Sequence, residues 1–248
     1  MHRPARPVPG VGLGHRHRLG LVLAHAVYQP QLEPGSRCTP ACRTHGPNQA
    51  IDEVAWRTGV HLLTCGCSPW RLKRHNKAGG DALKKLYQDL GFSWEEKNVS
   101  VHIDSGKRVD AICKNAAADY RPQAVDITVG CGACQTYVTP AAAREPGWLT
   151  DRLEREKTGK HGGACVRMGM TFAPAAFTTY GGWGKIVYGK LDEEYEQRKK
   201  EEKAEGKSGW AAYRWKRDLL ERMSIAIAKG NWALLDAHTP VRPFGAAA

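Results

Sequence analysis

The sequence lacks long apolar stretches and, at its beginning, acidic residues. No run of about 18 apolar residues occurs, so no transmembrane helix is expected. Residues 1–32 contain no Asp or Glu and are rich in Arg, His, Gly and Pro. We therefore predict that residues 1–36 form a disordered lead-in or the remnant of an upstream domain. Leu19 to Val27 also resembles the apolar part of a signal peptide, and a mitochondrial or plastid leader is a further alternative.

Acidic residues are outnumbered over the whole chain as well. The 248 residues include 37 Lys and Arg against 25 Asp and Glu, a formal net charge of +12. Such an excess favours a polyanionic partner, because neutralised phosphates release condensed counterions. We expect DNA, with RNA as the alternative, no membrane and no small-molecule cofactor. The expected location is nuclear or otherwise intracellular. The competing interpretation is a solvated basic surface without a specific ligand.

The eight cysteines are spread along the chain, with histidines near several of them. This distribution favours metal binding in a reducing compartment over a disulfide framework. Two quartets have ligand spacing suited to tetrahedral Zn²⁺. The first comprises Cys38, Cys42, His61 and Cys65, where Cys67 is an alternative to Cys65. The second comprises Cys131, Cys134, His161 and Cys165. We favour the first as a structural zinc knuckle, because Cys131 directly follows a strand that looks buried and His161 lies beside the candidate lysines. The remaining alternative is that neither quartet binds a metal.

Alternation and helical spacing divide the rest of the chain. Residues 69–90 have a basic helical pattern. Strands are expected over 98–103 and 107–113, joined as a hairpin, over 123–129 in a central position, and over 170–179. Pro174 suggests an edge or a bulge in the last of these. Helices are expected from Trp148 to Lys160 and from Ile186 to Leu235.

Two aspartates lie on neighbouring predicted strands. Asp110 and Asp126 meet at one end of a sheet if these strands are adjacent. Two close carboxylates repel unless a cation lies between them, and Mg²⁺ prefers such oxygen ligands. On the following helix, Leu153, Lys157 and Lys160 share a face, so both lysines point toward the carboxylates if Leu153 packs on the sheet. Spacing alone, however, favours aspartates in turns and a solvated basic helix.

The order of the motifs carries a resemblance. His61-Leu-Leu-Thr-Cys65, Arg74-His75-Asn76, Arg108-Val-Asp110, Val125-Asp126-Ile-Thr128-Val and Glu156-Lys157-x-x-Lys160 follow one another. This order resembles the carboxy-terminal part of non-LTR retrotransposon proteins that carry a restriction-like endonuclease. Those proteins place a CCHC knuckle and an Arg/Lys-His-Asp/Asn motif before a PD-(D/E)xK-type core. The resemblance covers about residues 38–185.

The resemblance implies a role for each matched residue. Cys38, Cys42, His61 and Cys65 would bind zinc, and Asp110 and Asp126 would bind Mg²⁺. Lys157 would be the catalytic lysine, moved from strand to helix, with Lys160 beside it. Arg74, His75 and Asn76 would support DNA placement or the active site. Val109 replaces a usual proline, and His161 replaces a tyrosine. No reverse-transcriptase domain fits upstream, as expected of a truncated reading frame, a gene-model fragment or a domesticated remnant.

Together these observations predict an α/β fold with four segments. They are the lead-in (1–36), the CCHC zinc knuckle (37–68), a restriction-endonuclease-like core (69–185) and a helical charged tail (186–248). The core is expected to be a mixed sheet of about four strands flanked by helices. The expected function is Mg²⁺-dependent nicking of DNA. The alternatives are a catalytically decayed nucleic-acid-binding zinc protein and a structural zinc protein without nucleic-acid affinity.

Overall fold

The computed structural model describes residues 63, 74–76, 82–95, 99–100, 108–115, 121–134 and 137–238. The lead-in and all four residues of the predicted zinc knuckle, Cys38, Cys42, His61 and Cys65, lie outside these ranges. Zinc binding by the knuckle therefore stays a prediction.

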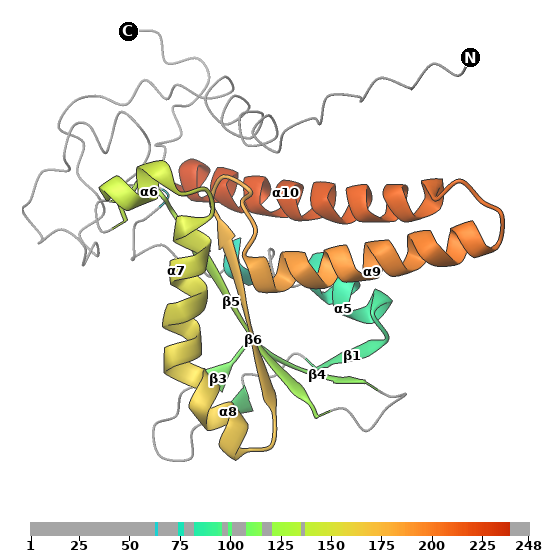
Figure 1. Cartoon of the computed structure of the whole chain (residues 1–248). Coiled ribbons are helices and arrows are strands. Elements are labelled where there is room, and N and C mark those ends of the chain that lie inside the picture. The colour runs from blue at the N-terminus through green and yellow to red at the C-terminus, as the bar shows by residue number, and fades with distance from the viewer. Residues whose placement is uncertain are drawn as a thin grey trace, which may run out of the picture. The chain divides into compact units, whose positions relative to one another are not determined.

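Short helices and strands precede two long helices in the described part of the chain (Figure 1). In chain order the elements are α5 (Lys84–Asp89), β1 (Phe92–Glu95), β2 (Val99–Ser100), β3 (Arg108–Val109), β4 (Ala111–Asn115), β5 (Gln123–Gly130), α6 (Pro140–Arg144), α7 (Trp148–Lys157), the π-helical turn η3 (Thr158–Gly162), α8 (Gly163–Arg167), β6 (Thr171–Thr178), α9 (Lys185–Ala204) and α10 (Trp210–His238).

The main sheet has the strand order β1-β4-β5-β6. Strands β1, β4 and β5 are antiparallel neighbours, whereas β6 runs parallel to β5. A parallel neighbour needs a crossover connection, and α6, α7, η3 and α8 supply it. The chain is thus a mixed α/β fold with a four-stranded sheet flanked by helices, as the sequence predicted.

Strand β5 is central and β6 lies at the edge of this sheet, as expected. Four consecutive residues of β5, 124–127, are buried. Pro174 of β6 lies opposite Asp126 in the parallel register. An edge strand tolerates proline because one side of its backbone needs no ladder hydrogen bond.

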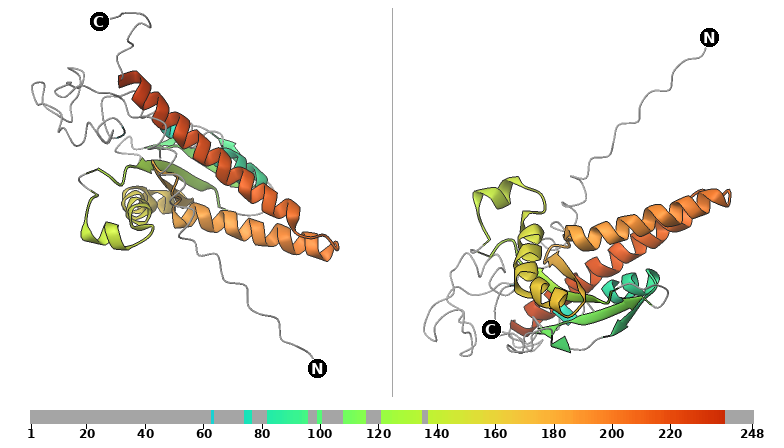
Figure 2. Two further views of the ribbon diagram at one scale, coloured as in Figure 1. Left: turned by 90° about the horizontal axis from the view of Figure 1, so that it is seen from above. Right: turned by 60° about the horizontal axis from the view of Figure 1, so that its bottom comes forward.

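The two faces of the sheet meet different helices (Figure 2). Successive strand residues point to opposite faces, and Val125 and Ile127 join the main core together with residues of α5, α9 and α10. Ala124 lies in a second, smaller cluster with Cys165 of α8. Asp126 alternates with Val125 and Ile127, so its side chain points to the face that α7 covers.

The strand predicted over 107–113 is divided at Asp110. Before the bend, β3 pairs with β2 in a separate two-stranded sheet, and after it β4 pairs with β1 and β5. Strand β1 was not predicted from the sequence. Its Phe92 and Trp94 rings pack against Tyr87 of α5, with ring centroids 5.7 and 5.4 Å from that of Tyr87.

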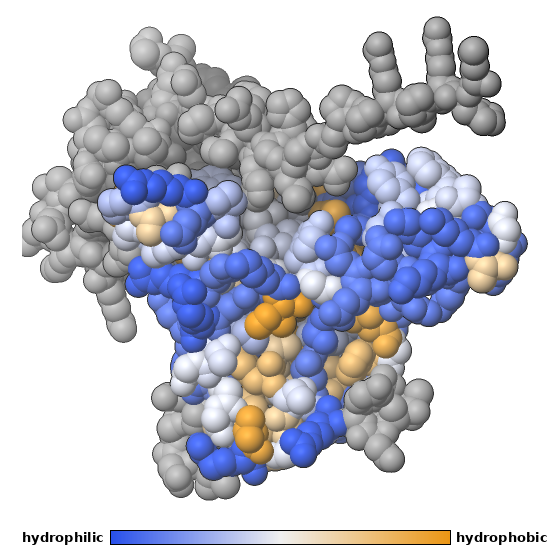
Figure 3. Space-filling model, in the orientation of Figure 1, coloured by the Kyte–Doolittle hydropathy of each residue, from blue (hydrophilic) through white to orange (hydrophobic). Residues whose placement is uncertain are grey.

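The predicted helical tail consists of two helices, α9 and α10, that lie side by side (Figures 1 and 2). Gly206 and Gly209 lie between them with φ of 73° and 78°, a backbone conformation that side chains disfavour. Hydrophilic residues cover the hairpin in the view of Figure 3, whereas hydrophobic residues show between α7 and the beginning of α9. No helix in the described ranges is long and apolar enough to cross a membrane.

Candidate active site

The two aspartates meet where β4 begins beside β5. Ala111 is paired with Val125, and the Asp110 backbone N–H donates to Val125 O over 3.0 Å. The Asp110 carboxylate turns back onto β5, where Oδ2 accepts from the Ile127 N–H at 2.6 Å. It lies close enough to Asp126 for its charge to raise the pKa of that carboxyl.

Lys157 of α7 completes the cluster. Its Nζ lies 2.6 Å from Asp126 Oδ2, and the two side chains are 24% and 6% exposed. One turn earlier on α7, the buried Leu153 side chain packs against the sheet. A Cβ on Gly130 would lie 2.7 Å from Leu153 Cδ1, so glycine permits this close approach. The sequence-based condition for bringing Lys157 to the aspartates is therefore met.

Lys160 lies outside the cluster. It is exposed and forms no ion pair with Asp110 or Asp126, all three being within the described residues. The reason is the π-helical turn η3, which has more residues per turn than an α-helix. Buried His161 consequently occupies the next position on the sheet-facing side, with Nε2 3.7 Å from Asp126 Oδ2.

The sequence contained a signal for this arrangement that the helical-face argument missed. Leu153, Lys157, His161 and Cys165 recur every four residues. This interval drifts around a regular α-helix but stays on one side when a wider turn intervenes. Gly159, Gly162 and Gly163 interrupt the helical pattern in the same stretch.

His75 supports Asp110 from the opposite side. Its Nε2 lies 3.1 Å from Asp110 Oδ2 and 2.9 Å from Ile127 O, two acceptors, so this nitrogen carries the hydrogen. The other ring nitrogen lies 3.2 Å from Asn76 Oδ1. Asn76 itself is exposed. His75 thus contacts Asp110 directly and Asn76 contacts His75, while their support of DNA placement or of the active site stays a prediction.

The sequence matches no protein-family model and no curated protein. The assignment of the site therefore rests on its geometry and chemistry.

The charges of the site influence one another. Burial opposes ionisation of Asp110, but the His75 hydrogen bond and charge, the Ile127 N–H and the Lys157 charge together lower its pKa. For Asp126, burial dominates and raises the pKa against the opposing effect of Lys157. Burial would lower the pKa of His75, but the hydrogen bond and charge of Asp110, together with Asn76 and the Ile127 carbonyl, raise that pKa. The site thus holds one readily ionised carboxylate and one that depends on a nearby cation.

Arg74 does not lie on the protein surface, where an arginine that contacts DNA would lie. Its side chain is buried, with 3% exposure, and Nη1 donates to Leu63 O at 3.2 Å and to Asn231 Oδ1 at 3.1 Å. The structure therefore favours the support role over direct DNA contact, because the guanidinium is enclosed by protein.

The second cysteine quartet is not gathered into a site. Cys131, Cys134, His161 and Cys165 all lie in the described part of the chain. Within that part, no three or more His, Cys, Asp or Glu side chains form a group able to hold a metal ion. Cys131 Sγ instead lies 4.0 Å from the Tyr180 hydroxyl. The aspartate site accordingly offers a pair of carboxylates, not a closed cage of protein ligands.

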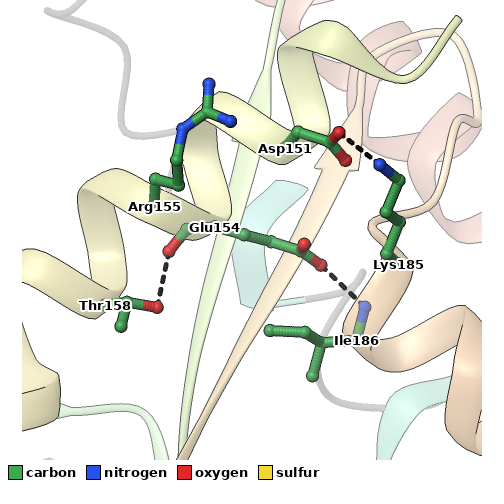
Figure 4. A pocket seen from close by; sticks show the side chains of 6 residues that line it. All are labelled: Asp151, Glu154, Arg155, Thr158, Lys185 and Ile186. Atoms are coloured by element: carbon green, nitrogen blue, oxygen red, sulfur yellow. Dashed lines mark hydrogen bonds and ion pairs between the residues drawn. The ribbon is translucent and has the colours of Figure 1, made fainter.

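A pocket of about 320 Å³ lies on another side of α7 (Figure 4). Its lining residues are Asp151, Glu154, Arg155, Thr158, Lys185 and Ile186. Glu154 Oε1 accepts from the Ile186 N–H at 3.0 Å, and Lys185 Nζ lies 2.6 Å from Asp151 Oδ2. The pocket includes neither aspartate of the cluster, so its opening does not define the candidate active site.

Proposed function

We propose that this chain is a retroelement-derived DNA endonuclease domain that nicks duplex DNA in a Mg²⁺-dependent reaction. The observation that carries the proposal is the convergence of Asp110, Asp126 and Lys157 beside the central strand. The mixed sheet of four strands flanked by helices also has the coarse architecture that the resemblance implies. The convergence of the three side chains and the arrangement of the sheet are separate observations, and each supports the proposal.

The donor set suits Mg²⁺. This ion prefers oxygen ligands and is often bound by one or two carboxylates, with water and substrate phosphate oxygens completing its shell. Burial raises the pKa of Asp126, and the adjacent Asp110 raises it further. A cation near both carboxylates relieves this penalty. When bound, Mg²⁺ would supply an activated water and stabilise negative charge on the phosphodiester.

The protein residues have distinct roles in this proposal. Asp110 and Asp126 would hold the metal. Lys157, the cation in contact with Asp126, orients the attacking water and stabilises charge on the phosphodiester oxygens. Thr128 stands on β5 where a strand lysine is expected, so α7 supplies the lysine instead. His75 holds Asp110 through its Nε2–H, and the basic surface holds the DNA backbone without reading its sequence.

Plasmid nicking with Mg²⁺ tests the proposal. We expect Asp126→Asn to abolish nicking and Lys157→Met to slow it by about 100-fold or more, since a positioned electrostatic group is worth that much. Lys160→Met is the matched control, because Lys160 lies on the adjoining turn but is exposed. It should nick at nearly the wild-type rate. Wild-type nicking by both Asp126→Asn and Lys157→Met, with all variants folded by thermal unfolding, would contradict the assignment.

A nucleic-acid-binding module that has lost catalysis is the second candidate. Two observations favour it: the net charge of +12, and the direct contact of Lys157 with Asp126, which competes with a metal for the same oxygen. Retarded migration of DNA with the wild-type protein, without nicking in Mg²⁺ or Mn²⁺, would support this function.

A further inference from the structure

The end of α10 is joined to the segment that carries His75, although more than 150 residues separate them in sequence. Asn231 uses both ends of its side-chain amide. Its Oδ1 accepts from Arg74 Nη1 at 3.1 Å, and its Nδ2 donates to Thr179 O at 2.7 Å, just after β6. Asn231 therefore ties Arg74 to both α10 and the end of the sheet.

Gly230 brings the backbone of α10 against the same arginine. A Cβ at position 230 would lie 2.5 Å from Arg74 Cγ, 2.7 Å from Cβ and 2.8 Å from Cα. The last of these atoms belongs to the backbone, so a side chain at position 230 would displace the chain at Arg74. That displacement would pass directly to His75, the next residue.

His75 is the link to the catalytic carboxylates. Its Nε2 lies within 3.1 Å of Asp110 Oδ2 and 2.9 Å of Ile127 O. These contacts require a fixed position of the His75 imidazole relative to β5. Because His75 directly follows Arg74, the position of the Arg74 backbone sets the position of that side chain. Three links thus join α10 to the site. They are the hydrogen bond between Asn231 and Arg74, the peptide bond from Arg74 to His75, and the contact of His75 with Asp110.

From this series we infer that the end of α10 positions the active site, with Gly230 and Asn231 as positioning residues that hold His75 against Asp110 through Arg74. The inference rests on the proposed nuclease function only for its effect on rate. The effect on His75 is independent of any reaction. A residue that directly holds a metal ligand, as His75 would hold Asp110, is worth about 10- to 100-fold in activity, and Gly230 and Asn231 act through that residue.

The test compares glycine substitutions in two helices of the full chain. Gly230→Ala fills the close approach to Arg74, whereas Gly189→Ala in α9 meets nothing within 4 Å. Alanine raises helix propensity in both cases by about 1 kcal/mol, so helix loss cannot explain a difference between them. We expect Gly230→Ala to lower kcat for nicking by about 10-fold or more with little change in KM. Gly189→Ala should resemble the wild type.

Two substitutions at position 231 test the hydrogen bond separately. Asn231→Asp keeps an oxygen for Arg74 and loses only the donor to Thr179 O, whereas Asn231→Leu has a similar shape and loses both hydrogen bonds. We expect the aspartate variant to retain nicking and the leucine variant to lose it. Should Gly230→Ala fail to fold, this pair decides the question, because neither substitution adds an atom at position 230.

Proton NMR of His75 provides a readout that does not depend on activity. In the wild type the Nε2–H should be protected from exchange with water by Ile127 O and Asp110. Gly230→Ala and Asn231→Leu should lose this protection while retaining cooperative unfolding. An unchanged Nε2–H signal in both variants would overturn the positioning inference. If the wild-type protein does not nick DNA, the proposed function fails, but the NMR comparison still decides whether α10 positions His75.

Discussion

The buried and half-buried carboxylates at the candidate site have specific hydrogen-bond and ion-pair partners. Asp126 is buried and depends on Lys157, while Asp110 is held by His75 and a backbone N–H. Glu154, on the same helix as Lys157, has a different role, since its carboxylate accepts from the first turn of α9. Lys157 therefore contributes to the candidate site, whereas Glu154, three residues earlier, joins α7 to α9.

Glu154 should make stability depend on pH. Burial raises its pKa above the ordinary 4.5, helped by Asp151 and opposed by the Ile186 N–H and Lys185; Arg155 also lines this pocket. Folding thus favours the protonated form. This contribution is complete below the unfolded pKa and is lost as the pH rises through the folded pKa.

Glu154→Gln keeps an oxygen for the Ile186 N–H and removes the titration. Relative to wild type, its free energy of unfolding should increase as the pH rises above about 4.5, and the difference should level off once the pH exceeds the raised pKa of folded Glu154. Urea unfolding at a series of pH values measures this difference. A difference that stays constant with pH would contradict the argument.

At the scale of elements, the contact between α7 and β5 decides which residues reach the site. The helix is seated by Leu153 over Gly130, and its last side chain, Lys157, then falls beside Asp126. The π-helical turn that follows sends His161 inward and Lys160 outward. The order of helices and strands along the chain therefore does not determine which side chains form the cluster. The local geometry of α7 and η3 determines it.

Leu153→Ala should weaken that contact. Truncating a buried leucine costs about 2–5 kcal/mol in free energy of unfolding, through lost transfer energy and the cavity left behind. The matched control is Val166→Ala in α8, where the side chain is 65% exposed. It should change stability by no more than about 0.5 kcal/mol. Chemical denaturation of both variants provides the measurement, and equal losses would show that Leu153 does not anchor α7.

At the scale of the whole molecule, charge governs the expected partner. The chain has a formal net charge of +12. Exposed basic residues occur on α7, α8 and α10, such as Arg155, Arg167 and Arg214.

DNA binding should consequently be strongly dependent on salt. The Asp126→Asn variant allows binding to be measured without cleavage. If about six phosphates are contacted, its affinity should fall about 1000-fold between about 50 and about 200 mM salt. Fluorescence anisotropy with a short duplex measures this. An affinity that does not change with salt would argue against a phosphate-binding surface and favour a structural zinc protein.

Local patterns in the sequence were sufficient for several features of the fold. The β5 and β6 strands, the helix beginning at Trp148 and the helical tail follow from alternation and helical spacing, which depend on near neighbours in the chain. The convergence of Asp110, Asp126 and Lys157 was expected only from the resemblance in motif order, because their spacing alone favoured a solvated basic helix. Strand β1 was missed because its four residues depend on Tyr87 and on pairing with β4.

The sequence by itself determined the residue types of the candidate site and the strand that carries Asp126, whereas Asp110 lies at a bend between two strands. Tertiary structure decided which lysine reaches them, because a π-helical turn separates Lys157 from Lys160. It also decided that Arg74 lies inside the protein, since its partner Asn231 comes from a helix at the far end of the sequence. Spacing along the chain fixes neighbours on one element, whereas burial and contacts between distant elements arise only when those elements pack.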